Sequence, residues 1–387
     1  MSRSNFAITE EHEALRDVVR QFVNTHVIPT ASERDTRDEY PEDLLPGLAG
    51  LGVMGMSIPE EFGGSHVDMI SYALAFEELA RGWMGLASVV GSSASGAWLI
   101  AEYGTDAQKQ EYLPELARGR RTSGIALTEP SAGSDLKAIR LAAKRADDHY
   151  LVSGSKTMIT HARHASPLVV LVRTDTTGEI AHRGMSLLLV EPGTAGYTIG
   201  RDLSKLGHKG VELCELQFDK ARVPVGNLLG DVEGQGFYQM MSALDRGRIY
   251  MAGAATGIAR ASLEAAAQYA REREAFGQPI GNFQAIKLKL AQMSTNIEAA
   301  RLLTLNAARL IQAEGRASTE AAMAKVFAAE TAIGASLDAM RILGGYGYTT
   351  EFPVERYFRD APLMAIGEGT NEILQLLIAD GVLASRP

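Results

Sequence analysis

The sequence predicts an α+β protein built from three consecutive zones, the first helical, the second β and the third helical again. Three observations support this fold class. Apolar residues recur at helical spacing in residues 1–121, short runs of branched aliphatic residues fill 122–234, and long helical patterns occupy 235–387. A chain of 387 residues is long enough for two or three domains with substantial cores. Because no repeat, low-complexity tract or long linker separates the zones, we expect three domains with these boundaries packed as one body.

The first zone is expected to be an all-helical domain of short helices joined by glycine and proline loops. Thr9 precedes a helical pattern as a capping residue, and Pro29 is expected to end that run. Further helices are predicted at 71–82 and 106–119. The apolar positions of the first pattern follow helical spacing: Leu15, Val18, Val19, Phe22 and Val23.

The middle zone is expected to be a small antiparallel β domain. Four short segments rich in branched aliphatic residues, each bounded by turn-forming or charged residues, read as strands: 149–154, 167–174, 184–191 and 212–218. No helix of useful length separates them, which argues against a parallel sheet with helical crossovers.

The third zone is expected to hold the long helices of a bundle. From Ile286 to Ile311 an apolar or small residue recurs in alternating steps of four and three, the spacing of helices packed nearly parallel. A second run from Ala322 to Met340 shows the same spacing. It is expected to end at Gly344 and Gly345, where glycine supplies the C-terminal cap.

Composition and charge exclude several classes of protein. With 38 basic and 47 acidic side chains the net charge is −9, and no basic cluster suggests nucleic-acid binding. The longest uncharged apolar run identified, 167–172, is far shorter than the roughly 20 residues of a membrane span. The N-terminal segment lacks the apolar core of a secretory signal, so we expect no membrane association and a cytoplasmic location. One cysteine, Cys214, excludes an intrachain disulfide.

Short motifs for metal, nucleotide or acyl-transfer chemistry are weak. His161 and His164 lie in a context typical of a loop, with no nearby carboxylate, so we predict no metal site. The glycines at 344, 345 and 347 lack the preceding strand and third glycine of a dinucleotide fingerprint. Neither a complete P-loop nor a serine nucleophile motif is present.

Nine segments, in order along nearly the whole chain, carry a resemblance to a known family. They are 52–64, 103–119, 126–135 (ALTEPSAGSD), 153–160, 218–230, 244–248 (LDRGR), 273–284, 342–348 and 359–373 (RDAPLMAIGEGTNEI). Together they resemble the acyl-CoA dehydrogenase flavoproteins. The resemblance implies an N-terminal helical domain, a central antiparallel β-barrel domain and a C-terminal four-helix bundle, which agrees with the zones identified from periodicity.

The resemblance implies an FAD site assembled from distant parts of the chain. Thr160 matches the residue whose hydroxyl approaches flavin N5, and Met158 replaces the usual aromatic residue over the flavin ring. The implied FAD contacts in the middle zone are Ile125, Leu127, Thr128, Ser134, Met158 and Thr160. Those in the third zone, partly reaching a neighbouring subunit, are Arg273, Phe276, Gln284, Arg341, Gly344, Gly345, Thr370 and Glu372.

Glu368 is the implied catalytic base. The Gly-Glu-Gly triplet alone would be a surface turn, but by resemblance Glu368 removes the α-proton of an acyl thioester while the β-hydrogen leaves as hydride to flavin N5. Some family branches place the base one residue before the arginine of LDRGR, and here that position is Gly247. The implied substrate contacts are Ser134, Asp245, Arg248, Gly367 and Gly369. Gly367 replaces a frequent tyrosine, so we expect room for a branched or bulky acyl chain.

The function predicted from this resemblance is FAD-dependent dehydrogenation of an acyl-CoA to a trans-2-enoyl-CoA. Electrons would pass to an electron-transferring flavoprotein, and the protein would be a homotetramer. Two alternatives stay open at this point: a flavin oxidase of the same fold that produces hydrogen peroxide, and a noncatalytic helical acyl-CoA-binding protein.

Overall fold

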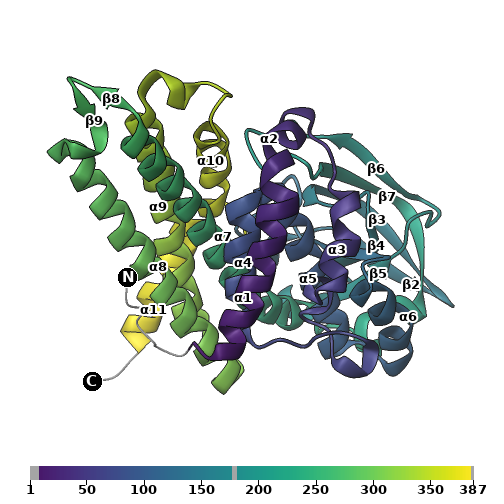
Figure 1. The fold of residues 1–387 in the computed structure, drawn as a ribbon. Coiled ribbons are helices and arrows are strands. Elements are labelled where there is room, and N and C mark those ends of the chain that lie inside the picture. The colour runs from purple at the N-terminus through teal and green to yellow at the C-terminus, as the bar shows by residue number, and fades with distance from the viewer. Residues whose placement is uncertain (1–7, 177–180, 385–387) are drawn as a thin grey trace.

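The computed structural model describes residues 8–176 and 181–384. Its order of helical, β and helical domains confirms the predicted fold class. In Figure 1 the sheet lies at one end of the molecule, the long bundle helices lie at the other, and the N-terminal helices pack between them.

The N-terminal domain begins with helix α1 (Glu10–Phe22), which Thr9 caps as predicted. The Thr9 hydroxyl accepts from the backbone of His12, and the His12 side chain accepts from the backbone of Thr9. The helical path does not end at Pro29, which corrects the sequence expectation. A π-helical turn (Val23–Val27) follows, and Pro29 then stands in the first turn of helix α2 (Ile28–Arg37), where its missing N–H has no partner to lose.

Four further helices complete this domain: α3 (Leu45–Gly50), α4 (Met69–Gly82), α5 (Met84–Tyr103) and α6 (Asp106–Ala117). The helices predicted at 71–82 and 106–119 are therefore present as α4 and α6. Residues 84–101 of helix α5 form a longer uncharged stretch than 167–172, and the helix is long and apolar enough to cross a membrane. Most of it is buried inside the protein, as expected for a core helix.

The middle domain contains strands β1 (Thr122–Ala126), β2 (Ala142–Ala146), β3 (His149–Thr160), β4 (Ala165–Arg173), β5 (Met185–Val190), β6 (Tyr197–Asp202) and β7 (Leu213–Pro224). The pairings run from β1 through β4, β2, β3 and β7 to β6, and β5 pairs with β4. The expectation of an antiparallel sheet needs a correction, because β4 pairs in parallel with both β1 and β2. The β2–β3 hairpin lies between β1 and β4 in sequence, so a parallel pair forms here without a crossover helix.

The C-terminal domain is a bundle of α7 (Gly236–Glu272), α8 (Gln284–Glu314), α9 (Ser318–Leu343) and α11 (Asn371–Ala384). A short hairpin of β8 (Glu274–Ala275) and β9 (Gln278–Pro279) joins α7 to α8, and helix α10 (Val354–Asp360) lies between α9 and α11. Helix α9 ends at Gly344, whose φ is +63°, as the glycine pair predicts. Most of the predicted apolar face of α8 is buried, including Met293, Ile297, Ala300, Ala307 and Ile311.

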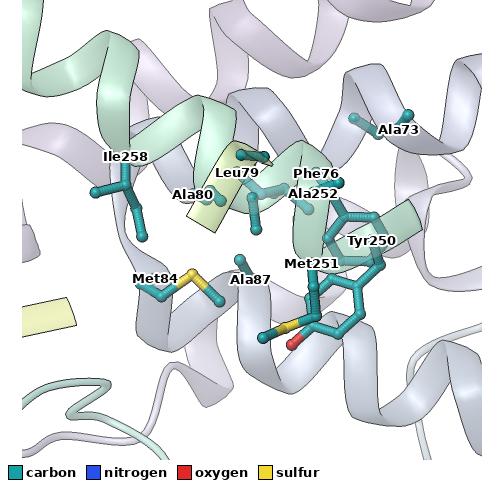
Figure 2. Close-up of a cluster of buried hydrophobic side chains, with 14 of the residues drawn as sticks. Ala73, Phe76, Leu79, Ala80, Met84, Ala87, Tyr250, Met251, Ala252 and Ile258 are labelled. Atoms are coloured by element: carbon teal, nitrogen blue, oxygen red, sulfur yellow. The ribbon is translucent and has the colours of Figure 1, made fainter. Parts of the chain in front are cut away.

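Helix α7 joins the bundle to the N-terminal domain. Figure 2 shows Tyr250, Met251, Ala252 and Ile258 of α7 among the side chains of α4 and α5. Those neighbours are Ala73, Phe76, Leu79, Ala80, Met84 and Ala87. The same stretch of α7 carries the LDRGR segment, so this core fixes the backbone on which the candidate site is built.

Candidate active site

Glu368 lies in the turn that precedes α11, and this turn has an unusual backbone. Glu368 has φ +55° and the next residue, Gly369, has φ +93°. A left-handed conformation at a residue with a side chain costs about 1–2 kcal/mol and is found where the surroundings hold it, often at functional sites. The turn therefore places Glu368 in a position that a regular helix would not give.

The carboxylate of Glu368 lies directly against α7 at Gly247. A Cβ built on Gly247 would be only 2.7 Å from Oε2 of Glu368. Any side chain at position 247 would have to displace this carboxylate. The two base positions implied by the resemblance thus converge on one place in space, and in this chain Glu368 fills it.

Opposing influences set the charge state of Glu368. Burial of its carboxyl group raises its pKa above the ordinary value, while the positive charges of Arg248 and Lys325 lower it. The net pKa is raised, because the removal of water outweighs the two cations. A carboxylate with a raised pKa is a better general base near neutral pH than a fully solvated one.

Asp245 and Arg248 form a buried pair one turn apart on α7. Arg248 Nη1 donates to Asp245 Oδ1 at 2.5 Å, and the Ser318 hydroxyl donates to Asp245 Oδ2 at 2.5 Å. The Nε atom of Arg248 is buried without a hydrogen-bond partner among the described residues. The structure therefore brings Asp245, Arg248 and Glu368 together, with one guanidinium donor still available to a ligand.

Aromatic side chains form a wall beside Glu368. The rings of Tyr72 and Tyr250 each lie 4.7 Å from that of Phe76, centre to centre. Burial raises the pKa of both phenols, and the Glu368 carboxylate raises it further, so both are neutral donors near the base. A Cβ built on Gly91 would lie 2.8 Å from the ring of Tyr250, so this ring occupies the space over α5 at that position.

Gly367 directly precedes the base, and a Cβ could be placed there without displacing its neighbours. A Cβ built there would meet Met251 Cε at 3.4 Å and Leu363 O at 3.5 Å, which are close to ordinary contact distances. Gly369 follows Glu368 and completes the turn. Thr370 accepts from the backbone of Ile373 at 3.4 Å at the start of α11, and the exposed Glu372 lies in the first turn of that helix.

A second group of predicted residues gathers in the middle domain. The backbone of Thr157 donates to the carbonyl of Thr128 at 2.9 Å, which joins the loop after β1 to strand β3. The pairing of β3 with β7 is interrupted between Lys156 and Ile159, and Met158 within this bulge has φ +56° and is 56% exposed. The structure therefore brings together Thr128, Met158 and Thr160, next to Ile125 and Leu127; Ser134 lies on the exposed part of the same loop.

Glu129 and Lys156 hold this loop in place, and the sequence analysis did not single them out for that role. The buried carboxylate of Glu129 accepts from the backbone of Arg140 at 2.6 Å and of Leu141 at 2.9 Å. Lys156 Nζ donates to Glu129 at 3.0 Å and to the carbonyl of Leu127 at 2.7 Å. A charged residue in the middle of a strand pattern was the signal that could have revealed Lys156.

A third group lies at the hairpin end of the bundle. Arg273, Gly344 and Gly345 line one cavity of about 480 Å³, together with Tyr269, Ile280, Ile342, Leu343, Tyr346 and Thr349. Phe276, Gln284 and Arg341 are not part of its lining. Phe276 projects from the hairpin turn and is 95% exposed, Gln284 begins α8, and Arg341 pairs with Asp338 at 3.7 Å.

The middle-domain group and the hairpin group are far apart in one subunit. Figure 1 shows the β8–β9 hairpin at the opposite end of the molecule from the sheet. A single bound cofactor therefore cannot contact both groups of the same chain.

The comparisons with known proteins decide the family. Models of the N-terminal, middle and C-terminal domains of acyl-CoA dehydrogenase match residues 9–120, 124–221 and 234–383. The chain belongs to the acyl-CoA dehydrogenase family. It is 41% identical to an acyl-CoA dehydrogenase of Bacillus subtilis over 97% of this chain and 99% of the relative.

Two solved structures extend this result. A chain in the structure of the electron transferring flavoprotein of Acidaminococcus fermentans is 39% identical, with a TM-score of 0.95, over 98% of this chain and 100% of that one. A glutaryl-CoA dehydrogenase of Mycobacterium smegmatis in complex with FADH2 is 30% identical, with a TM-score of 0.92, over 98% and 96% of the two chains. This acyl-CoA dehydrogenase is therefore an oxidoreductase whose cofactor is FAD.

The residues of this dehydrogenase fit FAD on their own chemistry. A Cβ built on Gly344 or Gly345 meets no other heavy atom within 4 Å, so the backbone of both glycines borders open space. Arg273 lines the same cavity. Backbone N–H groups and a guanidinium are the donors that a pyrophosphate requires. On the sheet side, Thr160 offers a hydroxyl and Met158 a polarizable thioether to a flat ring.

Proposed function

We propose that this dehydrogenase removes one hydrogen from each of the α and β carbons of an acyl-CoA, with Glu368 as the base, and releases a trans-2-enoyl-CoA. The observation that carries the proposal is the position of the Glu368 carboxylate over Gly247, with its pKa raised by burial. The resemblance implies two positions for the base, and because position 247 is a glycine here, Glu368 is the candidate that remains.

Each neighbouring residue has a part in this step. Glu368 accepts the α-proton on a carboxylate oxygen, and binding of the acyl chain would exclude water and favour this transfer further. The thioester oxygen gains negative charge as the proton leaves, and Arg248 is our candidate to stabilise it through its Nε, which has no hydrogen-bond partner among the described residues. FAD, when bound through the residues named above, supplies the acceptor for the β-hydrogen. Asp245 holds Arg248 in position.

The proposal is tested by the spectrum of the purified protein. We expect a yellow holoenzyme whose flavin absorption bleaches when a short acyl-CoA is added without oxygen, with one equivalent of trans-2-enoyl-CoA formed. A methyl-branched and a straight-chain acyl-CoA should both be tried, with free CoA as the control that carries no α-proton. A flavin-loaded protein that no acyl-CoA bleaches would contradict the proposal.

An electron-transferring flavoprotein is the proposed acceptor of the electrons, in preference to oxygen. The similarity to a chain in a solved electron transferring flavoprotein structure supports this choice. An oxidase of the same fold is the rival. Hydrogen peroxide formed in air at the rate of acyl-CoA consumption, with no stimulation by an added flavoprotein acceptor, would favour the oxidase.

A compact acyl group is the proposed substrate class. The Tyr250 ring lies against Gly91 of α5, and we propose that it limits the length of a straight acyl chain beside the base. A glycine at 367 leaves no side chain directly before Glu368, and we propose that a branch or ring near the reacting carbons takes that volume. A pocket that is short and wide favours a branched or bulky acyl chain over a straight chain of medium length.

A homotetramer is the proposed assembly. One FAD would use the sheet residues of one subunit and the Arg273 hairpin of its neighbour, because the two groups lie at opposite ends of one chain. Large apolar side chains are exposed near this end of the bundle and would be covered by the neighbour: Phe276, Leu288 and Tyr348.

A further inference from the structure

A buried lysine on α9 reaches the turn that carries Glu368. Lys325 is only 1% exposed and lies on the small-residue face of the helix, three residues after Ala322. Its Nζ donates to the carbonyl of Gly369 at 2.8 Å and to Asn371 Oδ1 at 3.1 Å. Asn371 in turn donates to Glu330 Oε1, also on α9, at 2.8 Å. The lysine therefore connects the bundle to the residues directly after the base.

Lys325 binds the backbone at a turn whose conformation is unfavourable. Glu368 and Gly369 are both left-handed, and the Gly369 carbonyl that Lys325 binds belongs to the second of them. A hydrogen bond from a charged donor is stronger than one between neutral groups. Without it, the turn could relax toward a commoner backbone conformation and carry the Glu368 carboxylate away from its place over Gly247.

The charge of Lys325 also acts on Glu368. The charged and titratable groups that face Glu368 are Arg248 and Tyr250 from α7, Tyr72 from α4 and Lys325 from α9. Arg248 already shares its charge with Asp245 at 2.5 Å. Lys325, by contrast, has no carboxylate oxygen within 4.0 Å of Nζ among residues 8–176 and 181–384, and the more distant acidic groups around it are Glu368, Glu372 and Glu330.

We propose that Lys325 is a positioning residue for catalysis: it fixes the turn after Glu368 through Gly369 and Asn371, and at neutral pH it supplies a positive charge that favours the carboxylate form of the base. The proposal rests on the proposed role of Glu368. This role would explain why a lysine, whose burial costs free energy, lies on a helix face made of small apolar residues.

Two substitutions separate the charge from the hydrogen bonds. Loss of the positive charge in Lys325→Met raises the pKa of Glu368 further, so the rising acid limb of the kcat/KM profile should move to higher pH by about one unit. Lys325→Arg keeps the positive charge, so its acid limb should lie close to the pH of the wild-type limb. Asn371→Ala keeps the lysine charge, so it should lower kcat several-fold while leaving the limb in place. Lys144→Met, on the exposed side of β2, is the matched control.

An infrared titration of the holoenzyme gives a readout that does not depend on turnover. The carboxyl band that disappears in Glu368→Gln reports the protonation of Glu368, and its midpoint should rise by about one pH unit in Lys325→Met with FAD content unchanged. An unshifted midpoint in Lys325→Met, or an equal shift in Lys325→Arg, would overturn the role of the lysine charge. Unimpaired turnover in Glu368→Gln would instead overturn the proposed base, so the two failures are distinguishable.

Discussion

At the scale of single residues, the site depends on two glycines as much as on the base. Gly247 leaves the volume that the Glu368 carboxylate occupies, 2.7 Å from where a Cβ would stand. Gly367 directly precedes Glu368, and a Cβ there would contact Met251 Cε at 3.4 Å. One glycine thus determines where the base can lie, and the other influences which acyl group can approach it.

The role of Gly367 leads to a prediction about substrate preference. We expect Gly367→Tyr to lower kcat/KM for a branched acyl-CoA by at least about tenfold more than for a straight one, through a clash in the transition state. Steady-state kinetics with isomeric branched and straight acyl-CoA substrates provide the measurement. Gly367→Ala is the control, because its Cβ meets Met251 at an acceptable 3.4 Å. Equal losses on both substrates would refute a role for Gly367 in selection.

Sequence reasoning reached the base but not its surroundings. Glu368, Asp245 and Arg248 could be named because short motifs carry them, and the structure brings them together. Lys325, Tyr72 and Tyr250 come from three helices, and their approach to Glu368 depends on how those helices pack. Lys325 alone carried a signal, since a lysine on the apolar face of α9 must find polar partners when it is buried.

At the scale of secondary structure elements, a buried ionic cluster joins four helices behind the site. Glu77 and Glu78 of α4 are buried, and Arg260 of α7 donates to both. Arg301 of α8 pairs with Glu77 at 2.8 Å, and Arg20 of α1 pairs with Glu78 at 2.7 Å. Burial alone would raise the pKa of Glu77, but Arg301 and Arg260 outweigh it and lower that pKa to about 2.

Because of this cluster, we expect the free energy of unfolding to depend on pH and on the charge of Glu78. Because the folded pKa of Glu77 lies below its unfolded value, its contribution is present above about pH 4.5 and is lost as the pH falls toward 2. Glu78→Gln should lower the free energy of unfolding by about 3–5 kcal/mol, since it leaves buried arginine charges short of a partner. Denaturant unfolding at pH 7 and pH 3 provides the measurement.

The matched control is an exposed ion pair. Glu33 pairs with Arg37 on α2, with both side chains more than half exposed, and Glu33→Gln should cost less than about 1 kcal/mol. Equal costs for Glu78→Gln and Glu33→Gln would show that the buried cluster does not support the packing of these helices.

The elements also show what periodicity can and cannot predict. The spacing on α8 and α9 predicts bundle helices because one face of each is buried over most of its length. The parallel pairing of β4 with β1 was missed, because pairing partners far apart in sequence leave no local pattern. Pro29 predicts a helix end from sequence, but proline is also favoured in the first turn of a helix, and Pro29 lies in the first turn of α2.

At the scale of the whole molecule, the two groups of FAD residues at opposite ends of the chain predict a shared cofactor site. Subunits that carry Arg273→Ala and subunits that carry Thr160→Glu should each fail to retain FAD. Mixed and reassembled, they should regain a fraction of flavin binding, because one site in each mixed pair combines two intact halves. Light scattering should show a tetramer for the wild type. Failure of the mixture to regain FAD, or a flavin-loaded monomer, would contradict a shared site.

The central claim is that Glu368 removes the α-proton, and rapid mixing of Glu368→Gln with an acyl-CoA tests it most directly. Without oxygen, the wild-type flavin should bleach within the time of a single turnover. The amide of Glu368→Gln cannot accept a proton, so this variant should bind FAD and acyl-CoA as tightly as the wild type but bleach more slowly by several orders of magnitude. Bleaching of Glu368→Gln at a rate near that of the wild type would contradict the assignment.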